Sequence, residues 1–421
     1  MEKQFMSMRE FIDIPDMDTH ASVENFERFK EQFNHNKTYP YGFMAQSAVG
    51  NKMTVKDYYT HEVFETTSFV SNNYLGLSQH PKVKQAAKDA IDKYGAGTCA
   101  APPIGGYIDI HKELEEKLAR LHGQEKAILF TSGYSANIGV FQNMFNKADI
   151  VFADMYVHAS IYDGLRNNTN VKIYKHNDMN YLELVLKRSQ GKYRNMTIVV
   201  DGVFSQDGDL AKLPDICDLA EKYGAMVFVD DAHGAGVLGK DGKGTLDHFG
   251  VENRVDLVIG TFSKSMGTAG GYIAGSEKLI EYMRHFSRSN IFSVSVAPAV
   301  VAAASKAVDL FSEEPEHIKN LWKNTHYLKT KLADMGYDTG HSETPITPLM
   351  IRDDEKTLST ARKLLENGIY VVPAIYPAVK INDSRFRVSV TAQHTLSDLD
   401  KFCNLLAKIN NEYGLGISRN T

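Results

Sequence analysis

Short apolar runs that alternate with helix-length segments constrain the fold of this chain more than any other feature. Strands separated by such segments are typical of a mostly parallel sheet covered by helices on both faces. The pattern therefore predicts an α/β protein with its main sheet in the central part of the chain. The runs expected to form strands are Ala127–Phe130, Ile150–Ala153, Met196–Asp201, Met226–Asp230 and Leu257–Gly260.

Polar residues stand where several of these strands would end. They include Thr131-Ser132-Gly133, Asp201-Gly202, Asp230 and Lys264. Parallel strands end at the same edge of a sheet, and open α/β sheets bind ligands outside that edge. We therefore expect these residues to meet at one binding site.

A single lysine lies between small hydroxyl residues in the segment Gly260-Thr261-Phe262-Ser263-Lys264-Ser265. A lysine held in this way can form a Schiff base with pyridoxal phosphate. The hydroxyls of Thr261 and Ser263 can bind the phosphate of that cofactor. Taken alone, the segment is more typical of a solvated lysine in a loop.

A second segment favours the cofactor interpretation. In Val227-Phe228-Val229-Asp230-Asp231-Ala232-His233-Gly234, an apolar run ends in a carboxylate, and a histidine follows three residues later. A buried carboxylate at a strand end is the partner that a pyridinium nitrogen needs. His233 can reach the phenolic oxygen of the same ring.

Two more strand ends carry candidate cofactor contacts. Thr131-Ser132-Gly133-Tyr134 is a tight turn before a helix, where free backbone N–H groups and the helix dipole favour an anion such as phosphate. Helix capping by Ser132 explains the same turn equally well. His158 follows another run, and its flat ring could stack on a flat cofactor, although a lone histidine is more often structural.

The composition excludes several other classes of protein. The chain has 421 residues, 43% hydrophobic and 24% charged, with a net charge of −5 and no long basic run, which disfavours nucleic-acid binding. Cys99, Cys217 and Cys403 are scattered, so they indicate neither disulfides nor a metal site. We find no secretory signal and no apolar stretch near the ~20 residues of a transmembrane helix. These features predict a cytoplasmic enzyme without a metal.

The pattern divides the chain into three parts. Residues 1–60 are polar and poorly periodic, which indicates an N-terminal arm. Residues 61–296 contain the alternating runs and would form a large cofactor-binding domain. Residues 297–421 indicate a smaller α/β domain. In that domain the pattern predicts helices over 297–311 and 317–335, and strands near 347–351, 371–373 and 386–391.

From about Ser71 to its end, the chain resembles the α-oxoamine synthase family of fold-type I pyridoxal-phosphate enzymes. The resemblance implies an α/β fold with a mostly parallel seven-stranded central sheet and a smaller C-terminal α/β domain. The motifs that carry it are Ser71-Asn72-Asn73-Tyr74-Leu75-Gly76-Leu77, the turn at Gly133, Asp154 to Ser160, Asp201-Gly202-Val203-Phe204-Ser205, Asp230 to His233, Thr261 to Lys264, Phe292-Ser293, and Arg387-Val388-Ser389-Val390-Thr391-Ala392.

The resemblance assigns catalytic roles to four residues. Lys264 corresponds to the Schiff-base lysine, which also moves the proton at the α-carbon of the substrate. Asp230 corresponds to the partner of the pyridine nitrogen, His233 to the residue that binds the phenolic oxygen, and His158 to the stacking histidine. The resemblance also implies phosphate or other cofactor contacts from Gly133, Tyr134, Ser205, Thr261, Ser263 and Ser293.

The resemblance further implies a homodimer with a shared active site, because the family supplies the contact of Ser293 from the second subunit. Arg387 corresponds to the arginine that binds the substrate carboxylate, and its planar guanidinium suits bidentate binding. Arg385 is the less favoured candidate. Asn73 is also expected to contact the substrate.

One segment departs from many relatives of the family. Between Gly95 and Tyr107 this chain has Ala101-Pro102 and Gly106-Tyr107, where many relatives have a Ser-Arg or Thr-Arg pair and a later Gly-Thr. Ala101 is small, so it would leave room for a side chain on the α-carbon of the amino acid. Drift in a loop without functional meaning explains the change equally well.

The resemblance implies that an amino acid condenses with an acyl-CoA or acyl-carrier-protein thioester and loses carbon dioxide. We expect a reaction most like that of serine palmitoyltransferase, in sphingolipid biosynthesis. The alternatives are a relative like 8-amino-7-oxononanoate synthase, glycine C-acetyltransferase or cysteate C-acyltransferase. An aminotransferase on the same fold is a second alternative, and a catalytically silent regulatory subunit is a third.

Overall fold

The computed structural model describes residues 14, 16–40, 42–166 and 169–413, and they fall into two compact units. The large unit comprises residues 72–205 and 209–319. The small unit comprises the described residues up to 71, residues 206–208 and the described residues from 320. Helix α12 (Glu316–Asp334) begins in the large unit and continues into the small unit.

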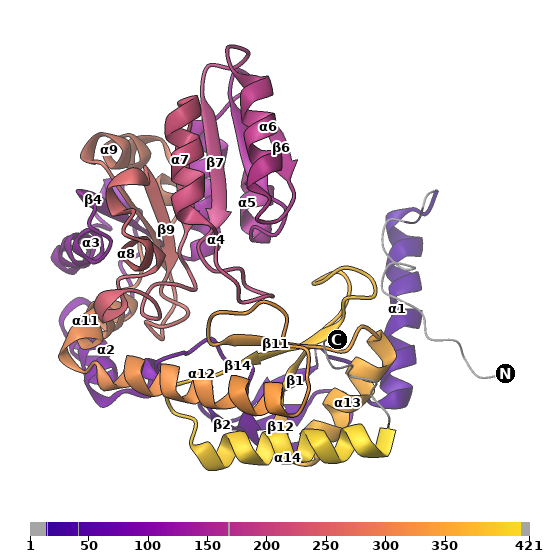
Figure 1. Cartoon of the computed structure of the whole chain (residues 1–421). Coiled ribbons are helices and arrows are strands. Elements are labelled where there is room, and N and C mark those ends of the chain that lie inside the picture. Colours follow the sequence, from indigo (N-terminus) through magenta and orange to yellow (C-terminus); the bar gives the residue numbers. More distant parts are fainter. Residues whose placement is uncertain (1–13, 15, 41, 167–168, 414–421) are drawn as a thin grey trace. The chain divides into compact units, whose positions relative to one another are not determined.

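A seven-stranded sheet forms the centre of the large unit, with the strand order β4-β10-β9-β8-β7-β5-β6 (Figure 1). Strands β9, β8, β7, β5 and β6 are parallel, and β10 is antiparallel to both of its neighbours. The strands are β4 (Lys126–Phe130), β5 (Ile150–Asp154), β6 (Asn170–Tyr174), β7 (Met196–Asp201), β8 (Met226–Asp230), β9 (Leu257–Thr261) and β10 (Gly271–Gly275).

Helices of the large unit flank this sheet, and α6 and α7 lie along β6 and β7 (Figure 1). The helices are α2 (Pro81–Tyr94), α3 (Asp109–Leu121), α4 (Gly133–Met144), α5 (Ala159–Leu165), α6 (Met179–Ser189), α7 (Leu213–Tyr223), α8 (Thr245–Phe249), α9 (Glu277–Phe286), α10 (Arg288–Ile291) and α11 (Pro298–Glu313). Four short 3-10 turns lie at Leu77–Gln79, Pro102–Ile104, Lys240–Gly242 and Glu252–Arg254.

The central strands are apolar on both faces because helices cover both faces of the sheet. Every residue of β5, β9 and β10 is buried, and Phe228 of β8 packs in one cluster with Ile259 and Ile273. Val140 and Phe141 of α4 join this cluster. The apolar core therefore fixes the strand ends, on which the polar residues stand.

The small unit contains two sheets and its own core. Its core includes Phe69, Leu328, Leu349, Phe386 and Phe402. One sheet has the order β1-β2-β3-β12, with β1 (Phe43–Ala45), β2 (Lys52–Asp57), β3 (Val63–Ser68) and β12 (Ile369–Tyr370). The other sheet has the order β11-β14-β13, with β11 (Ile346–Met350), β14 (Arg385–Ser389) and β13 (Val372–Ala374). Its helices are α1 (Thr19–Asn36), α13 (Asp354–Glu366) and α14 (Leu396–Tyr413).

The predicted fold class is confirmed, and all five predicted strands of the main sheet are present within one residue of their bounds. Strands β6 and β10 were not predicted, and no periodic pattern indicated α1 or β1 to β3. Among the residues that the structure describes, no helix combines the length and apolar character needed to span a membrane.

Candidate active site

A cavity of about 320 Å³ lies at the carboxyl ends of the parallel strands. This volume is at the lower end of the range for small-molecule sites, about 300–1,000 Å³. The site residues expected from the sequence that line it are Gly133, Tyr134, His158, Asp230, His233, Thr261, Ser263 and Lys264. The structure thus brings together eight residues that are as many as 131 positions apart in the sequence.

One end of the cavity has the donors that a phosphate needs. The N–H groups of Gly133 and Tyr134 lie in the first turn of α4, where a helix has no internal partner for them. A Cβ on Gly133 would lie 3.0 Å from the Cβ of Thr261, so the start of α4 packs closely on the end of β9. The hydroxyls of Thr261 and Ser263 lie 2.9 Å apart beside it.

The capping interpretation of this turn is also correct. The Oγ of Ser132 accepts a hydrogen bond from the backbone N–H of Ser135 at 2.9 Å, and the Oγ of Ser135 accepts one from the N–H of Ser132. This capping box satisfies the third helical N–H group and leaves the first two without a partner inside the helix. An anion bound at this turn would therefore use other N–H groups than the cap does.

A buried carboxylate, that of Asp230, lines the same cavity. Its Oδ2 accepts a hydrogen bond from Nδ2 of Asn137 at 2.8 Å, and its Oδ1 accepts one from the N–H of Ala232 at 3.1 Å. Only 7% of Asp230 is exposed. These two bonds fix the direction of the carboxylate, which is the arrangement that a pyridinium nitrogen requires of its partner.

Asp201 is a second carboxylate in the cavity wall, and the strand register sets it directly beside Asp230. Burial and the neighbouring charge of Asp230 raise the pKa of Asp201 well above its ordinary value. Its Oδ1 accepts a hydrogen bond from the backbone N–H of His158 at 3.2 Å. Asp201 therefore positions His158 and responds to the charge of Asp230.

A hydrogen bond with Ser160 orients the ring of His158. Its Nδ1 lies 2.7 Å from the Oγ of Ser160, which in turn accepts from Nδ2 of Asn137. Burial and the cation of Lys264 lower the pKa of His158, although the charge of Asp230 opposes them. A neutral ring of fixed orientation suits stacking on a flat cofactor.

Tyr74, Asn137 and Ser160 make contacts in the site that were not predicted from the sequence. The hydroxyl of Tyr74 lies 2.8 Å from Nδ1 of His233, and Asn137 binds both Asp230 and Ser160. The spacing of Asn137 could have indicated it, since a residue four positions after Gly133 lies on the same face of a helix. The pairing of Tyr74 with His233 depends on tertiary structure and leaves no local signal.

These donors and acceptors fit pyridoxal phosphate in one orientation. The amides and hydroxyls at one end match the phosphate, and Asp230 matches the ring nitrogen. His158 and Lys264 line the same cavity. All of these residues belong to the large unit.

Four predicted site residues of the large unit do not line this cavity. Ser205 lies in the loop after β7, and Ser293 lies after α10 beside a small second cavity. Asn73 is buried, and its Nδ2 donates to the Oγ of Ser78 at 2.7 Å. The carbonyl of Ala101 accepts from the N–H of Gly106 at 3.0 Å, next to the 3-10 turn.

The two candidate arginines lie on β14 of the small unit. Arg385 is paired with the carboxylates of Asp207 and Asp383. Arg387 is 6% exposed, and its Nη1 donates to the Oγ of Ser389 at 2.7 Å. Two carboxylates already balance the charge of Arg385, which makes it a poor candidate for binding a substrate carboxylate.

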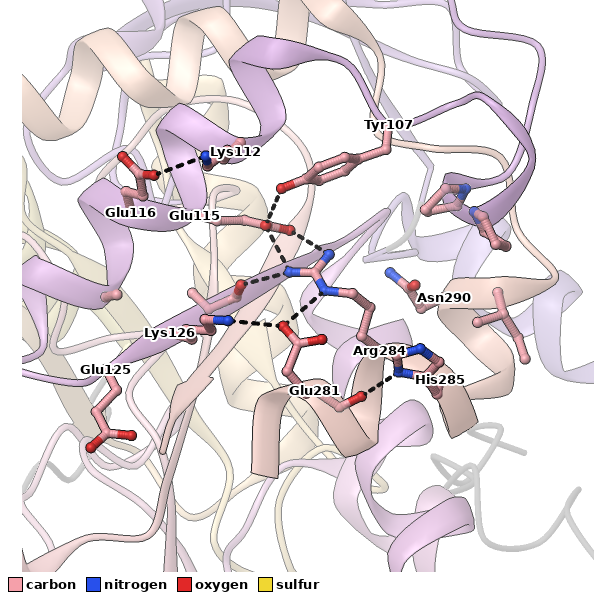
Figure 2. A pocket seen from close by; sticks show the side chains of 15 residues that line it. Tyr107, Lys112, Glu115, Glu116, Glu125, Lys126, Glu281, Arg284, His285 and Asn290 are labelled. Atoms are coloured by element: carbon pink, nitrogen blue, oxygen red, sulfur yellow. Dashed lines mark hydrogen bonds and ion pairs between the residues drawn. The ribbon is translucent and has the colours of Figure 1, made fainter. Parts of the chain in front are cut away.

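A larger cavity, of about 670 Å³, shares no lining residue with the first (Figure 2). Tyr107, from the segment that departs from the family, lies at its edge. The phenol of Tyr107 donates to Oε2 of Glu115 at 2.7 Å, and the guanidinium of Arg284 lies 5.3 Å from the centre of its ring. Tyr107, which differs from the residue of many relatives, is therefore part of a packed polar cluster.

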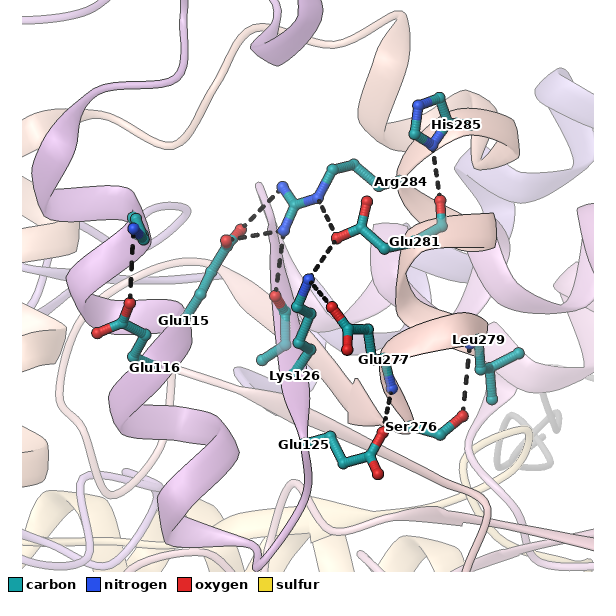
Figure 3. Close-up of polar contacts among 12 residues, drawn as sticks. Glu115, Glu116, Glu125, Lys126, Ser276, Glu277, Leu279, Glu281, Arg284 and His285 are labelled. Atoms are coloured by element: carbon teal, nitrogen blue, oxygen red, sulfur yellow. Dashed lines mark hydrogen bonds and ion pairs between the residues drawn. The ribbon is translucent and has the colours of Figure 1, made fainter.

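The charges around this larger cavity are paired with one another (Figure 3). Arg284 binds the buried carboxylate of Glu115 at 2.8 Å, and Lys126 binds Glu277 at 2.6 Å and Glu281 at 3.2 Å. Burial raises the pKa of Glu115, and Arg284 opposes this shift. Paired charges indicate a structural role here rather than a site for a particular ligand.

Substituting Arg284 by alanine is expected to lower the free energy of unfolding by about 2–3 kcal/mol, since it leaves the buried carboxylate of Glu115 unpaired. Urea unfolding at pH 7 measures this loss. Lys112→Ala is the matched control, because Lys112 and Glu116 are exposed and 3.9 Å apart. Equal stability of the two variants would contradict the structural role.

Comparisons with known proteins identify the family of this chain. The family model "Aminotransferase class I and II" matches residues 65–406. 8-Amino-7-oxononanoate synthase from Alkaliphilus metalliredigens is 48% identical over 346 residues, which cover 82% of this chain and 88% of the relative. 8-Amino-7-oxononanoate synthase 1 from Bacillus subtilis is 43% identical over 397 residues, or 93% of this chain and 100% of the relative.

Solved structures lead to the same family. Serine palmitoyltransferase from Sphingomonas wittichii superposes with a TM-score of 0.89 at 30% identity, covering 94% of this chain and 99% of that protein. 8-Amino-7-oxononanoate synthase from Francisella tularensis superposes with a TM-score of 0.71 at 25% identity, covering 83% and 99%. The chain therefore belongs to the α-oxoamine synthase family, a group of pyridoxal-phosphate-dependent acyltransferases.

Proposed function

We propose that this enzyme catalyses the reaction of an 8-amino-7-oxononanoate synthase. Relatives with this name are 43–48% identical to the chain, whereas the serine palmitoyltransferase structures are about 30% identical. This identity difference is the observation that carries the proposal. It favours the 8-amino-7-oxononanoate synthase reaction, which the sequence left open as an alternative, over the serine palmitoyltransferase reaction. The expected role in sphingolipid biosynthesis is not confirmed.

The name of the product specifies the two substrates by carbon counting. A decarboxylative condensation joins the acyl carbonyl carbon to the α-carbon of the amino acid, whose carboxylate leaves as carbon dioxide. In 8-amino-7-oxononanoate, carbons 8 and 9 then derive from alanine. Carbons 1 to 7 derive from a seven-carbon dicarboxylic acyl group, which is donated as a thioester.

Pyridoxal phosphate, when bound, supplies an electron sink that stabilises negative charge at the α-carbon of the amino acid. In this proposal the Lys264 amine holds the cofactor covalently and then moves the α-proton. Asp230 keeps the ring nitrogen protonated, His158 covers the ring, and His233 binds the phenolic oxygen. Hydrogen bonds that fix Asp230 and His158 support these roles.

Arg387 is proposed to bind the carboxylate of the amino acid through its planar guanidinium. Asn73 and Ala101 are proposed to lie near the substrate, and the small side chain of Ala101 is compatible with the methyl group of alanine. Ser205 is proposed to contact the cofactor. These assignments come from the family motifs, and the buried position of Arg387 on β14 is compatible with them.

An amino-acid panel tests the proposed substrate. Purified enzyme is mixed with alanine, serine, glycine or cysteate, each with the seven-carbon dicarboxylic thioester or palmitoyl-CoA, and free thiol is measured. We expect kcat/KM to be highest for alanine with the dicarboxylic thioester. Faster turnover of serine with palmitoyl-CoA would contradict the proposal and restore the serine palmitoyltransferase reaction.

We also propose a homodimer in which Ser293 of one subunit contacts the cofactor phosphate of the other. Mixing inactive Lys264→Ala with a variant altered at Ser293 and its neighbours should then restore activity through hybrid dimers. If the subunits reassort at random, about half of the dimers are hybrids, and each hybrid has one intact site of its two. Up to about a quarter of the wild-type rate is therefore expected. A fully active monomer in analytical ultracentrifugation would contradict the shared site.

A further inference from the structure

His176 is not among the residues that line the cavity of Lys264, yet both of its ring nitrogens face carboxylates. It follows β6, and its Nδ1 lies 3.0 Å from Oδ1 of Asp154. Its Nε2 lies 2.7 Å from Oδ2 of Asp209. The side chain of Asp154 is 1% exposed and that of Asp209 is 13% exposed, so water screens the three charges poorly.

The geometry requires a positively charged ring. An ionised carboxylate only accepts hydrogen bonds, so both nitrogens of His176 must donate, which only the imidazolium can do. Burial alone would lower the pKa of His176, but the hydrogen bonds with Asp154 and Asp209 outweigh burial and raise it to about 9. The ring is therefore charged at neutral pH.

The other titratable groups around this cluster include the carboxyl of Asp201, whose pKa is raised by burial and in part by the charge of Asp154, and several phenols. Tyr156 stacks on the ring of His176 with a centroid distance of 4.4 Å. The hydroxyl of Tyr162 donates to the carbonyl of Asp154 at 3.1 Å. Burial raises the pKa of Tyr162 to about 12 and raises that of Tyr174 well above its ordinary value, so both stay neutral over the pH range of the experiments below.

Asp154 connects His176 to the loop that follows β5. Its Oδ1 also accepts the backbone N–H of Tyr156 at 2.9 Å, and its carbonyl accepts that of Val157 at 3.2 Å. His158 is the next residue of this loop. The orientation of His158 thus depends on a turn that the Asp154 carboxylate holds from one side.

Asp209 connects His176 to the loop that follows β7. Its carbonyl accepts the backbone N–H of Phe204 at 3.0 Å, and the ring of Phe204 meets that of His176 edge to face at 4.4 Å. Ser205 is the next residue. Among the described residues, Oδ1 of Asp209 is buried and has no hydrogen-bond partner, and its Oδ2 also accepts from Nδ2 of Asn177 at 3.2 Å. His176 therefore supplies the cation for this carboxylate, and Asn177 adds a neutral donor.

We propose that His176 is a positioning residue for the acyltransferase reaction, because its contacts with Asp154 and Asp209 lock the loop of His158 onto the loop of Ser205. The proposal rests on the proposed cofactor contacts of these two loops. Asn177 also donates to both carboxylates, but it carries no charge. Without the cation, the two poorly hydrated carboxylates would repel each other and shift the two loops. A shift of about 1 Å at a reacting group can lower turnover about 10²-fold.

The test uses His176→Gln, Asp209→Asn and the double variant, each purified as the holoenzyme. Glutamine keeps hydrogen-bonding groups but removes the charge, so His176→Gln should lower kcat about 10–100-fold per mole of folded enzyme. The double variant also removes one of the facing carboxylates. The fold-decrease in kcat of the double variant should therefore be smaller than the product of the fold-decreases of the two single variants, since the two residues act as one unit.

A second readout reports the position of the cofactor without turnover. Visible circular dichroism of bound pyridoxal phosphate depends on how the protein holds the ring, and it should change in His176→Gln. His248→Gln is the matched control, because His248 is exposed in the same unit, and it should change neither kcat nor the spectrum. Unchanged kcat and spectrum in His176→Gln, despite any loss of stability, would overturn the proposal.

The same experiment separates this proposal from the proposed function. If the wild-type enzyme releases no thiol with any amino acid, the proposed function fails, but the circular dichroism still tests His176.

The dependence of stability on pH gives a third readout. The pKa of His176 rises from 6.5 to about 9 on folding. The contribution of the charged ring to the free energy of unfolding is therefore complete below pH 6.5 and is lost as the pH rises through 9.

The urea midpoint of the wild type should accordingly fall between pH 6.5 and 9 by more than that of His176→Gln. His248→Gln should follow the wild type over this range. Parallel curves for the wild type and His176→Gln would show that the ring is not held as a cation, and they would overturn the proposal.

Discussion

Lys264→Ala is expected to lower turnover by at least about 10⁴-fold, because the variant loses both the covalent attachment of the cofactor and the amine that moves the α-proton. Lys264 lines the cavity together with Asp230, His158 and the hydroxyls at the end of β9. Lys264 is the one lysine that lines that cavity among the residues that the structure describes, so no other described lysine there can replace the amine.

Borohydride reduction followed by mass spectrometry of the intact protein checks the covalent part of this prediction. The wild type should gain the mass of the reduced cofactor at Lys264, and Lys264→Ala should gain none. Lys278→Ala, in the exposed first turn of α9, is the control and should behave as the wild type. Retained labelling and activity in Lys264→Ala would contradict the assignment.

Asp230→Asn is expected to lower kcat by about 10³-fold, comparable to the loss of other preorganised charges in active sites. The new side chain has nearly the same shape, and its amide oxygen can still accept from the N–H of Ala232. Its NH2 group cannot accept from Nδ2 of Asn137, so the Asn137 amide would have to rotate and accept through its oxygen. The step most affected should be loss of the α-proton, which the protonated ring nitrogen assists.

Exchange of the α-proton of alanine with deuterated solvent isolates that step from acyl transfer. Asp230→Asn should exchange the proton far more slowly than the wild type, whereas Asp215→Asn, at an exposed position of α7, should not differ from it. Exchange in Asp230→Asn at the wild-type rate would show that this carboxylate is not the partner of the ring nitrogen.

Much of the large unit could be predicted because apolar runs bounded by polar residues define buried parallel strands. The run Met226–Asp230 became β8 without any change of bounds. Strand β6 was missed because it lies at the sheet edge with exposed residues such as Val171 and Ile173. Strand β10 begins and ends in glycine, and its place between β4 and β9 follows from pairing, not from local sequence.

The candidate site was predictable where function imposes a local motif. Lys264, Asp230 and Gly133 each stand at a strand end or a helix start, and each lines the cavity. Contacts between distant segments left no such signal. The pairing of Tyr74 with His233, and the charged bridge of His176, are formed by residues that only the folded sheet brings together.

The most direct test of the whole account measures carbon dioxide and free thiol in the same reaction. The holoenzyme is given alanine labelled with ¹³C at the carboxyl carbon and the seven-carbon dicarboxylic thioester. We expect one labelled carbon dioxide for each thiol released, and a product with the mass of 8-amino-7-oxononanoate. Transfer of the amino group to a keto acid, with neither thiol nor carbon dioxide released, would contradict the acyltransferase account.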